Sequence, residues 1–171
     1  MNLVAMSRKD IEAASEDLAL AGPCVAICIA YPNGRLHRVR ETNSCRAVLH
    51  LRFSDCDEAG AWSFPENKEG NVAMPMTRGQ AVDALDFIEK WRGEVSTIYA
   101  ACYGGVSRSR GILAGLAAVY GWDDAELYRS GQPNAWCKTL IVRDARTRAA
   151  RAAVARAEES IEGGSRRADT D

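Results

Sequence analysis

Apolar and polar positions along this chain fall into blocks that predict strands and helices in turn. Near the N-terminus, Ser7 and Asp10 form a helix-start pattern, and apolar residues follow at helical spacing. Residues 24–30 are rich in β-branched side chains and precede a Pro-Asn-Gly turn, so they predict a strand. Residues 46–53 alternate and then run apolar, which predicts a second strand.

The second half of the chain shows the same succession after a long loop. Residues 54–71 have no hydrophobic period and many turn residues, and loops of this length are often functional. Thr77 is placed to cap a helix, and residues 95–101 predict a third strand. The remaining predicted helices cover residues 108–120, 123–130 and 136–159.

This alternation predicts an α/β fold with three layers, in which a central, mainly parallel sheet of about four strands is flanked by helices. We expect a single domain over residues 1–160 and a flexible C-terminal tail over residues 161–171. Ligands of such sheets bind beyond the carboxyl ends of the strands, so we expect the chemistry there.

Composition and charge exclude several functions. The chain has 171 residues and a formal net charge of −1, which gives no overall attraction to nucleic acid or to a membrane surface. Charged residues interrupt residues 8–17, which argues against a signal peptide. No apolar run approaches the roughly 20 residues that span a bilayer. We therefore expect a cytoplasmic protein with reduced thiols and without nucleic-acid or membrane partners.

The sequence predicts neither a metal nor a cofactor. Cys24 and Cys28 are spaced C-x3-C, but no second cysteine or histidine pair follows at zinc spacing. The glycine-rich patterns that bind nucleotide and dinucleotide phosphates are absent as well.

One short segment combines residues that suit phosphate chemistry. Cys102 and Arg108 enclose five residues in the sequence CYGGVSR, directly after the third predicted strand and at the start of a helix. A second C-x5-R segment, residues 137–143, contains no glycine and lies within a predicted helix, so we interpret it as a coincidence of composition.

The first segment predicts a cup for a tetrahedral oxyanion. Gly104 and Gly105 let successive N–H groups point inward, and the following helix adds its own unpaired N–H groups. Arg108 can hold two oxygens with its planar guanidinium, and the same field favours the thiolate form of Cys102. The predicted phosphate-binding residues are Tyr103, Gly104, Gly105, Val106, Ser107 and Arg108.

This segment resembles the signature of the cysteine-based protein tyrosine phosphatases, H-C-x2-G-x2-R-[S/T]. Its matching positions are Cys102, Gly105, Arg108 and Ser109. Ala101 stands where the family usually has a histidine. The resemblance covers about residues 22–142 and implies a phosphotyrosine protein phosphatase-like fold.

Two further segments add to the resemblance. Residues 130–142, SGQPNAWCKTLIV, are similar to the S-P-N-x2-F-x2-Q-L segment of the dual-specificity branch, with Pro133 and Asn134 in place. Asn134 either caps a helix or supports the active site. Residues 51–58, LRFSDCDE, are similar to the strand and acid-bearing loop of small prokaryotic and phage members.

The resemblance implies that a phosphomonoester is hydrolysed in two steps without a metal. Cys102 attacks the phosphorus, an aspartate protonates the leaving oxygen, and water then hydrolyses the phosphocysteine. Ser109 is placed to hydrogen-bond the sulfur. Asp55 is the first choice for the acid because it directly follows a strand, and Asp57 and Glu58 are the alternatives.

Two other functions stay open at this point. One is a catalytically weak module that binds phosphate or phosphoproteins, because Ala101 replaces the histidine. The other is a thiol-based arsenate reductase or rhodanese-like enzyme with Cys56 or Cys137 as resolving cysteine. The expected partners are a phosphorylated protein or a small phosphomonoester, and the absence of lysine from residues 103–107 disfavours highly anionic lipid head groups.

Overall fold

The computed structural model describes residues 1–62 and 73–168, and the backbone alone for residues 160–168. The strands are β1 (Asn2–Ser7), β2 (Cys24–Ala30), β3 (Cys45–Arg52) and β4 (Thr97–Cys102). The helices are α1 (Arg8–Glu16), α2 (Arg78–Trp91), α3 (Arg108–Tyr120), α4 (Ala125–Arg129) and α5 (Ala135–Ala168). No helix within the described ranges is long and apolar enough to cross a bilayer.

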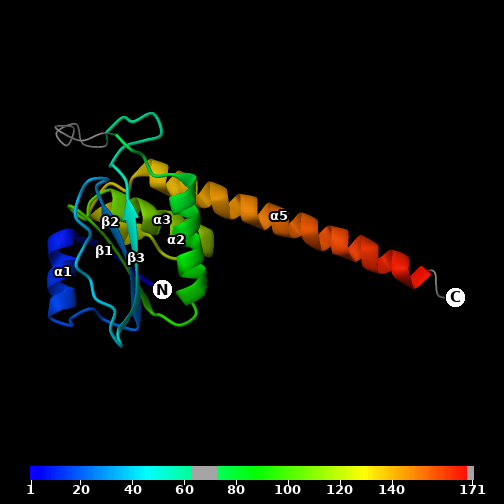
Figure 1. Cartoon of the computed structure of the whole chain (residues 1–171), viewed down its shortest axis with the longest axis horizontal. Coiled ribbons are helices and arrows are strands. Elements are labelled where there is room, and N and C mark those ends of the chain that lie inside the picture. Colours follow the sequence, from blue (N-terminus) through cyan, green and yellow to red (C-terminus); the bar gives the residue numbers. More distant parts are fainter. Residues whose placement is uncertain (63–72, 169–171) are drawn as a thin grey trace.

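The strands form one parallel sheet in the order β1-β4-β2-β3, with helices on both faces (Figure 1). Helix α1 covers one face, and α2, α3 and the start of α5 cover the other. Along β2, Val25, Ile27 and Ile29 pack on the α2 and α3 side, whereas Ala26 and Cys28 pack on the α1 side. A strand buried on both faces is typical of a parallel sheet, and the predicted three-layer α/β class is confirmed.

Most predicted elements lie close to the observed ones. Strand β2 and helix α3 have the predicted bounds, and α2 begins directly after Thr77, whose hydroxyl accepts a hydrogen bond from the Gln80 N–H. Strand β1 has no counterpart among the predicted elements. Its side chains are at most partly buried, because it pairs with β4 at the edge of the sheet, so it lacks the pattern of a buried strand.

Helix α5 extends past its predicted end. The pattern predicts a helix to residue 159, whereas the helical backbone continues to Ala168, through most of the segment expected as a tail. Helix α5 leaves the body of the protein after its first turns (Figure 1), and every residue from 149 to 159 is exposed. Of the predicted loop over residues 54–71, residues 63–71 lie outside the described part of the chain. Residues 54–62 contain a turn and an isolated bridge between Cys56 and Trp62.

Candidate active site

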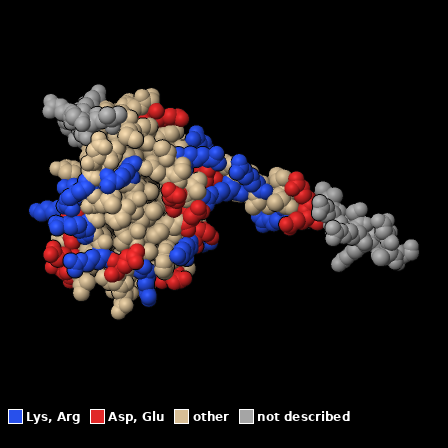
Figure 2. All heavy atoms as spheres, viewed as in Figure 1, with Lys and Arg blue, Asp and Glu red and all other residues tan. Residues whose placement is uncertain are grey.

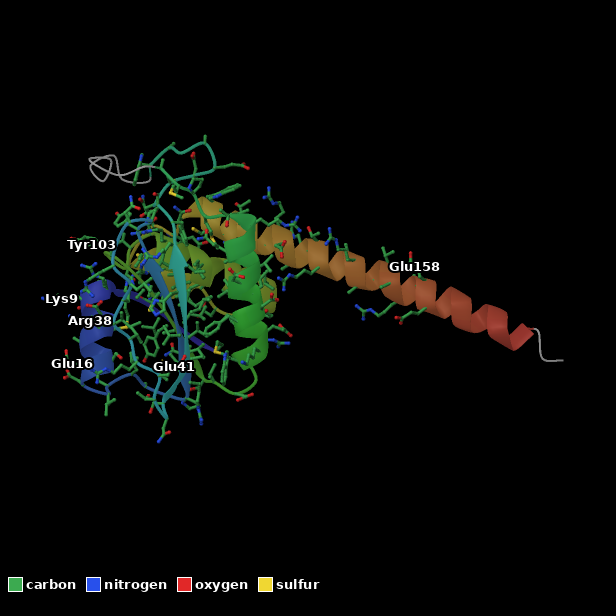
Figure 3. All side chains as sticks on the ribbon, in the orientation of Figure 1. Lys9, Glu16, Arg38, Glu41, Tyr103 and Glu158 are labelled. Carbon is green, nitrogen blue, oxygen red and sulfur yellow. The ribbon has the colours of Figure 1, made fainter. Side chains whose placement is uncertain are left out.

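Segments that follow three parallel strands meet around one pocket of about 180 Å³. Among its lining residues are Tyr31, Asp55, Cys102, Tyr103, Ser107 and Arg108. Tyr31 follows β2, Asp55 lies after β3, and Cys102 is the last residue of β4. The pocket therefore lies beyond the carboxyl ends of the strands, where parallel α/β sheets bind their ligands. Tyr103 is exposed at its rim (Figure 3).

The loop between Cys102 and Arg108 turns sharply at one glycine. Gly105 has a φ of +71°, in the left-handed region that residues with a side chain disfavour. A Cβ atom at this position would lie 2.6 Å from the carbonyl carbon of Met6 in β1, so the neighbouring strand leaves room only for glycine. Gly104 has no positive φ, and its backbone conformation does not require a glycine.

The carbonyl groups of this loop are bound by the surrounding protein. The bonds run from Arg8 N to Tyr103 O (3.3 Å), Arg110 Nε to Gly105 O (2.8 Å), Gln132 N to Val106 O (3.1 Å) and Asn134 N to Ser107 O (3.1 Å). Within the described residues, the N–H groups of residues 104–107 donate to no protein acceptor. They stay available to a bound oxyanion, as the glycine-rich sequence predicts.

Helix α3 begins at the end of this loop without a side-chain cap. Ser107 is the N-cap residue, but its hydroxyl donates to Asp55 Oδ1 at 2.7 Å and makes no bond to the helix. The unpaired N–H groups of the first turn of α3 favour an anion at this point. Loop and helix together form the cup that the sequence predicts.

Arg108 places a positive charge inside this cup. Its side chain is 1% exposed, and Nη1 donates to the Phe53 carbonyl at 2.9 Å. The Tyr31 ring lies against the guanidinium, with its centroid 4.2 Å from Cζ. Arg108 Nε is buried and, among the described residues, has no hydrogen-bond partner. An unpaired buried guanidinium N–H is costly unless a ligand accepts its hydrogen bond.

Cys102 lies within reach of the predicted serine. Its Sγ is 3.3 Å from Ser109 Oγ, and both residues are buried. Ala101 points to the opposite face of the sheet, where it packs in the α1-side core with Cys28 and Tyr99. The position that carries histidine in the family is therefore filled here by a small core residue.

The structure separates the two candidate aspartates. Asp55 is 5% exposed, lines the pocket, and accepts at Oδ1 from Ser107 Oγ (2.7 Å) and Asn134 Nδ2 (2.9 Å). Asp57 is exposed, and its Oδ1 accepts a hydrogen bond from Ala61 N at 2.8 Å within a local turn. Glu58 is also exposed, so Asp55 is the carboxylate that the structure brings beside Cys102.

The remaining cysteines lie away from solvent. Like Cys102, the other five are free and buried. Burial raises the pKa of Cys28 to about 12 and raises the pKa of Cys137 as well, so both favour the thiol. The second C-x5-R segment lies inside α5, where Arg143 is exposed and stacks on Trp136. The described residues contain no group of three or more histidine, cysteine, aspartate or glutamate side chains placed to hold a metal ion.

Three of the contacts in the pocket were not predicted from the sequence. These are the Tyr31 ring on Arg108, the Phe53 carbonyl and the side chain of Ser107. Tyr31 directly follows a predicted strand, and this position at the carboxyl end of the sheet was the available signal. A carbonyl group carries no signal in a sequence, because every residue has one.

Neither a family model nor a curated protein matches this sequence. Among solved structures, the chain is similar to PTPMT1 at 16% identity and a TM-score of 0.45, over 89% of this chain and 94% of that one. It is also similar to Tk-PTP in the active form at 14% identity and a TM-score of 0.46, over 86% and 93%. Both are cysteine-based protein tyrosine phosphatases, the family that the sequence resembles. Because the TM-scores are below 0.5, the function proposed below rests on the geometry of the pocket.

Proposed function

We propose that this protein is a metal-independent phosphomonoester hydrolase of the tyrosine or dual-specificity type, with a phosphocysteine intermediate at Cys102. One observation carries the proposal: the thiol of Cys102, the buried guanidinium of Arg108 and the carboxyl group of Asp55 line a single pocket beside an uncapped helix N-terminus. This combination offers a nucleophile, an anion site and a proton donor at one phosphorus atom.

In the first step, the Cys102 thiolate attacks phosphorus and the bond between phosphorus and the leaving oxygen breaks. Asp55, protonated, gives its proton to that oxygen. Arg108 and the N–H groups of residues 104–107 hold the phosphoryl oxygens as their charge develops. In the second step, Asp55 takes a proton from water, the water oxygen attacks phosphorus, and the sulfur–phosphorus bond breaks. Ser109 stabilises the departing thiolate through its hydroxyl, which lies 3.3 Å from the sulfur.

The proposed substrates are phosphorylated proteins or small phosphomonoesters. The pocket of about 180 Å³ has room for a phosphoryl group, and Tyr31 and Tyr103 form an aromatic wall for the group that carries it. One PTPMT1 structure similar to this chain is a complex with PI(5)P. Here residues 103–107 contain no lysine, so we favour substrates with a single phosphate. We place the reaction in the cytoplasm and without a cofactor.

Replacement of Cys102 tests this proposal. Cys102→Ser is expected to lower turnover of nitrophenyl phosphate by about 10⁴-fold or more, because a neutral hydroxyl cannot replace the thiolate. Binding of orthovanadate, measured by calorimetry, should persist because Arg108 and the loop remain. Cys137→Ala is the matched control from the second C-x5-R segment and should keep its turnover. Full activity of Cys102→Ser would contradict the proposal.

A second function, a phosphate-binding module with little turnover, is favoured by Ala101 alone. Its small side chain provides no imidazole to orient the loop from the α1 side. Wild-type protein that binds orthovanadate and shows no turnover would establish this function in place of the hydrolase.

A further inference from the structure

Asn134 joins three parts of the proposed active site, and it is 5% exposed. Its Nδ2 donates to Asp55 Oδ1 at 2.9 Å, and its Oδ1 accepts from the Cys137 N–H at 3.0 Å. Its main-chain N–H donates to the Ser107 carbonyl at 3.1 Å. The orientation of the amide is fixed, because only Nδ2 can donate to a carboxylate and only Oδ1 can accept from a main-chain N–H.

The contacts with Asp55 are unequal at its two oxygens. Both Asn134 Nδ2 and Ser107 Oγ donate to Oδ1, and among the described residues no hydrogen bond reaches Oδ2. Donors at Oδ1 stabilise negative charge on that oxygen, so the proton of the acid form belongs on Oδ2. Oδ2 is then the oxygen that protonates the leaving group.

Close packing holds Asn134 in place. A Cβ atom on Gly111 would lie 2.5 Å from the Asn134 carbonyl oxygen, so the backbone of α3 touches the start of α5. Asn134 therefore cannot shift toward α3 without a clash. The acid, the phosphate-binding loop and two helices share this one residue.

On the basis of the proposed function, we propose that Asn134 is a positioning residue, which holds Asp55 so that Oδ2 faces the leaving oxygen. Capping alone does not require asparagine here. Serine and aspartate cap helices as well, because a cap needs only an acceptor, whereas Asp55 needs the amide donor.

Variants that keep the cap and lose the donor test this role. Asn134→Asp and Asn134→Ser both retain an acceptor for the Cys137 N–H. With nitrophenyl phosphate, whose leaving group needs little protonation, we expect only a small loss of kcat. With an alkyl phosphate we expect a further loss of about 10–100-fold, the usual effect of removing a supporting hydrogen bond. In Asn134→Asp, the neighbouring carboxylate favours protonated Asp55, so the basic limb of the pH–rate profile moves to higher pH.

Thr77→Ala is the matched control, since it removes the N-cap of α2 and touches neither Asp55 nor the loop. It should leave the ratio of alkyl to nitrophenyl turnover and the pH profile unchanged. If the wild type turns over substrate and the Asn134 variants behave like Thr77→Ala, the positioning role is overturned and the hydrolase stays intact. A wild-type protein without any turnover that depends on Cys102 would instead contradict the proposed function, and the positioning role with it.

Discussion

Arg108 shows at the scale of one residue how the pocket is built for an anion. A guanidinium with 1% exposure has lost its hydration, and its contacts are a carbonyl group and an aromatic ring. Among the described residues it pairs with no carboxylate. A buried charge normally has a charged partner, and in the proposed reaction the phosphoryl group of the substrate is that partner.

Arg108→Lys tests whether the shape of this cation matters. An ammonium group keeps the charge but cannot hold two oxygens in a plane while contacting Phe53. We expect kcat/KM for nitrophenyl phosphate to fall by about 10²–10³-fold, as for loss of a transition-state donor. The inhibition constant of orthovanadate should rise in parallel. Unchanged values for both would show that Arg108 binds no phosphoryl oxygen.

A comparison of two aspartates tests the assignment of the acid. Asp55→Asn should slow hydrolysis of alkyl phosphates by about 10²–10⁴-fold, because their leaving oxygen requires a proton. Nitrophenyl phosphate should be affected less. Asp57→Asn should behave like wild type for both substrates, since Asp57 only accepts a bond within a local turn. The reverse pattern would assign the acid to Asp57.

The sequence was informative about residues whose role depends on residue type, and less so about contacts. Cys102, Arg108, Ser109 and Asp55 were predicted from motif and position, and the structure brings all four to one site. Asn134 was left between two roles, and its amide makes one contact that fits each: Oδ1 accepts from the Cys137 N–H and Nδ2 donates to Asp55. Ser107 was expected in phosphate binding as part of the loop, and the bond of its hydroxyl to Asp55 was not predicted, because no local pattern reveals a partner so distant in the chain.

At the scale of elements, a buried central strand was easier to predict from the sequence than an edge strand. Strand β2 is buried on both faces, and its apolar run predicts its bounds. Strand β1 was not predicted. It nevertheless shapes the pocket, because its backbone leaves room only for glycine at position 105. Its edge position gives it a weak hydrophobic pattern, so tertiary pairing with β4 decides its structure.

The contact between α2 and α5 depends on a buried carboxylate. Asp144 is 3% exposed and pairs with Arg78 and Arg148, each at 2.9 Å. Burial acts to raise the pKa of Asp144, but the hydrogen bonds from the two arginines outweigh it and hold the pKa below its ordinary value. The ionised form is thus the one that stabilises the fold.

The lowered pKa of Asp144 makes the stability of the fold depend on pH. A lowered folded-state pKa contributes stability that is present above about pH 4 and is lost as the pH falls further. We expect Asp144→Asn to lower the free energy of unfolding at pH 7 by about 1–2 kcal/mol, less than for fully buried pairs because the arginines are 58% and 38% exposed. Urea unfolding at pH 7 and pH 3 should show this difference shrinking in acid. An equal difference at both pH values would contradict the role of the ion pair.

At the scale of the whole molecule, helix α5 packs on the body at its start and then projects from it, with residues 149–159 all exposed. Lysine and arginine side chains gather where α5 leaves the body, and acidic residues follow further out (Figure 2). Glu158 lies on this projection, away from Tyr103 at the rim of the pocket (Figure 3). Arg148 makes contacts to Asp86 and Val82 of α2 close to the point of departure.

Removal of the projection tests whether the catalytic unit is complete without it. A chain ending at Ala150 keeps Asp144 and Arg148 and, among the residues with described side chains, loses only the exposed residues 151–159. We expect its melting temperature and its kcat/KM for nitrophenyl phosphate to stay close to those of the full chain, because the exposed side chains of residues 151–159 bury little surface. A chain ending at residue 142, which lacks Asp144, is the contrasting variant and should be destabilised. Loss of activity in the chain ending at Ala150, with its melting temperature unchanged, would assign the projection a part in the reaction.

The most direct test is to trap the phosphorylated enzyme. Wild-type protein mixed with a phosphomonoester, quenched rapidly and digested, should carry one phosphoryl group on the peptide that contains Cys102. The same treatment of Cys102→Ser should give an unmodified peptide. Turnover by the wild type with no phosphoryl group on Cys102, or with the label on another residue, would contradict the proposed mechanism.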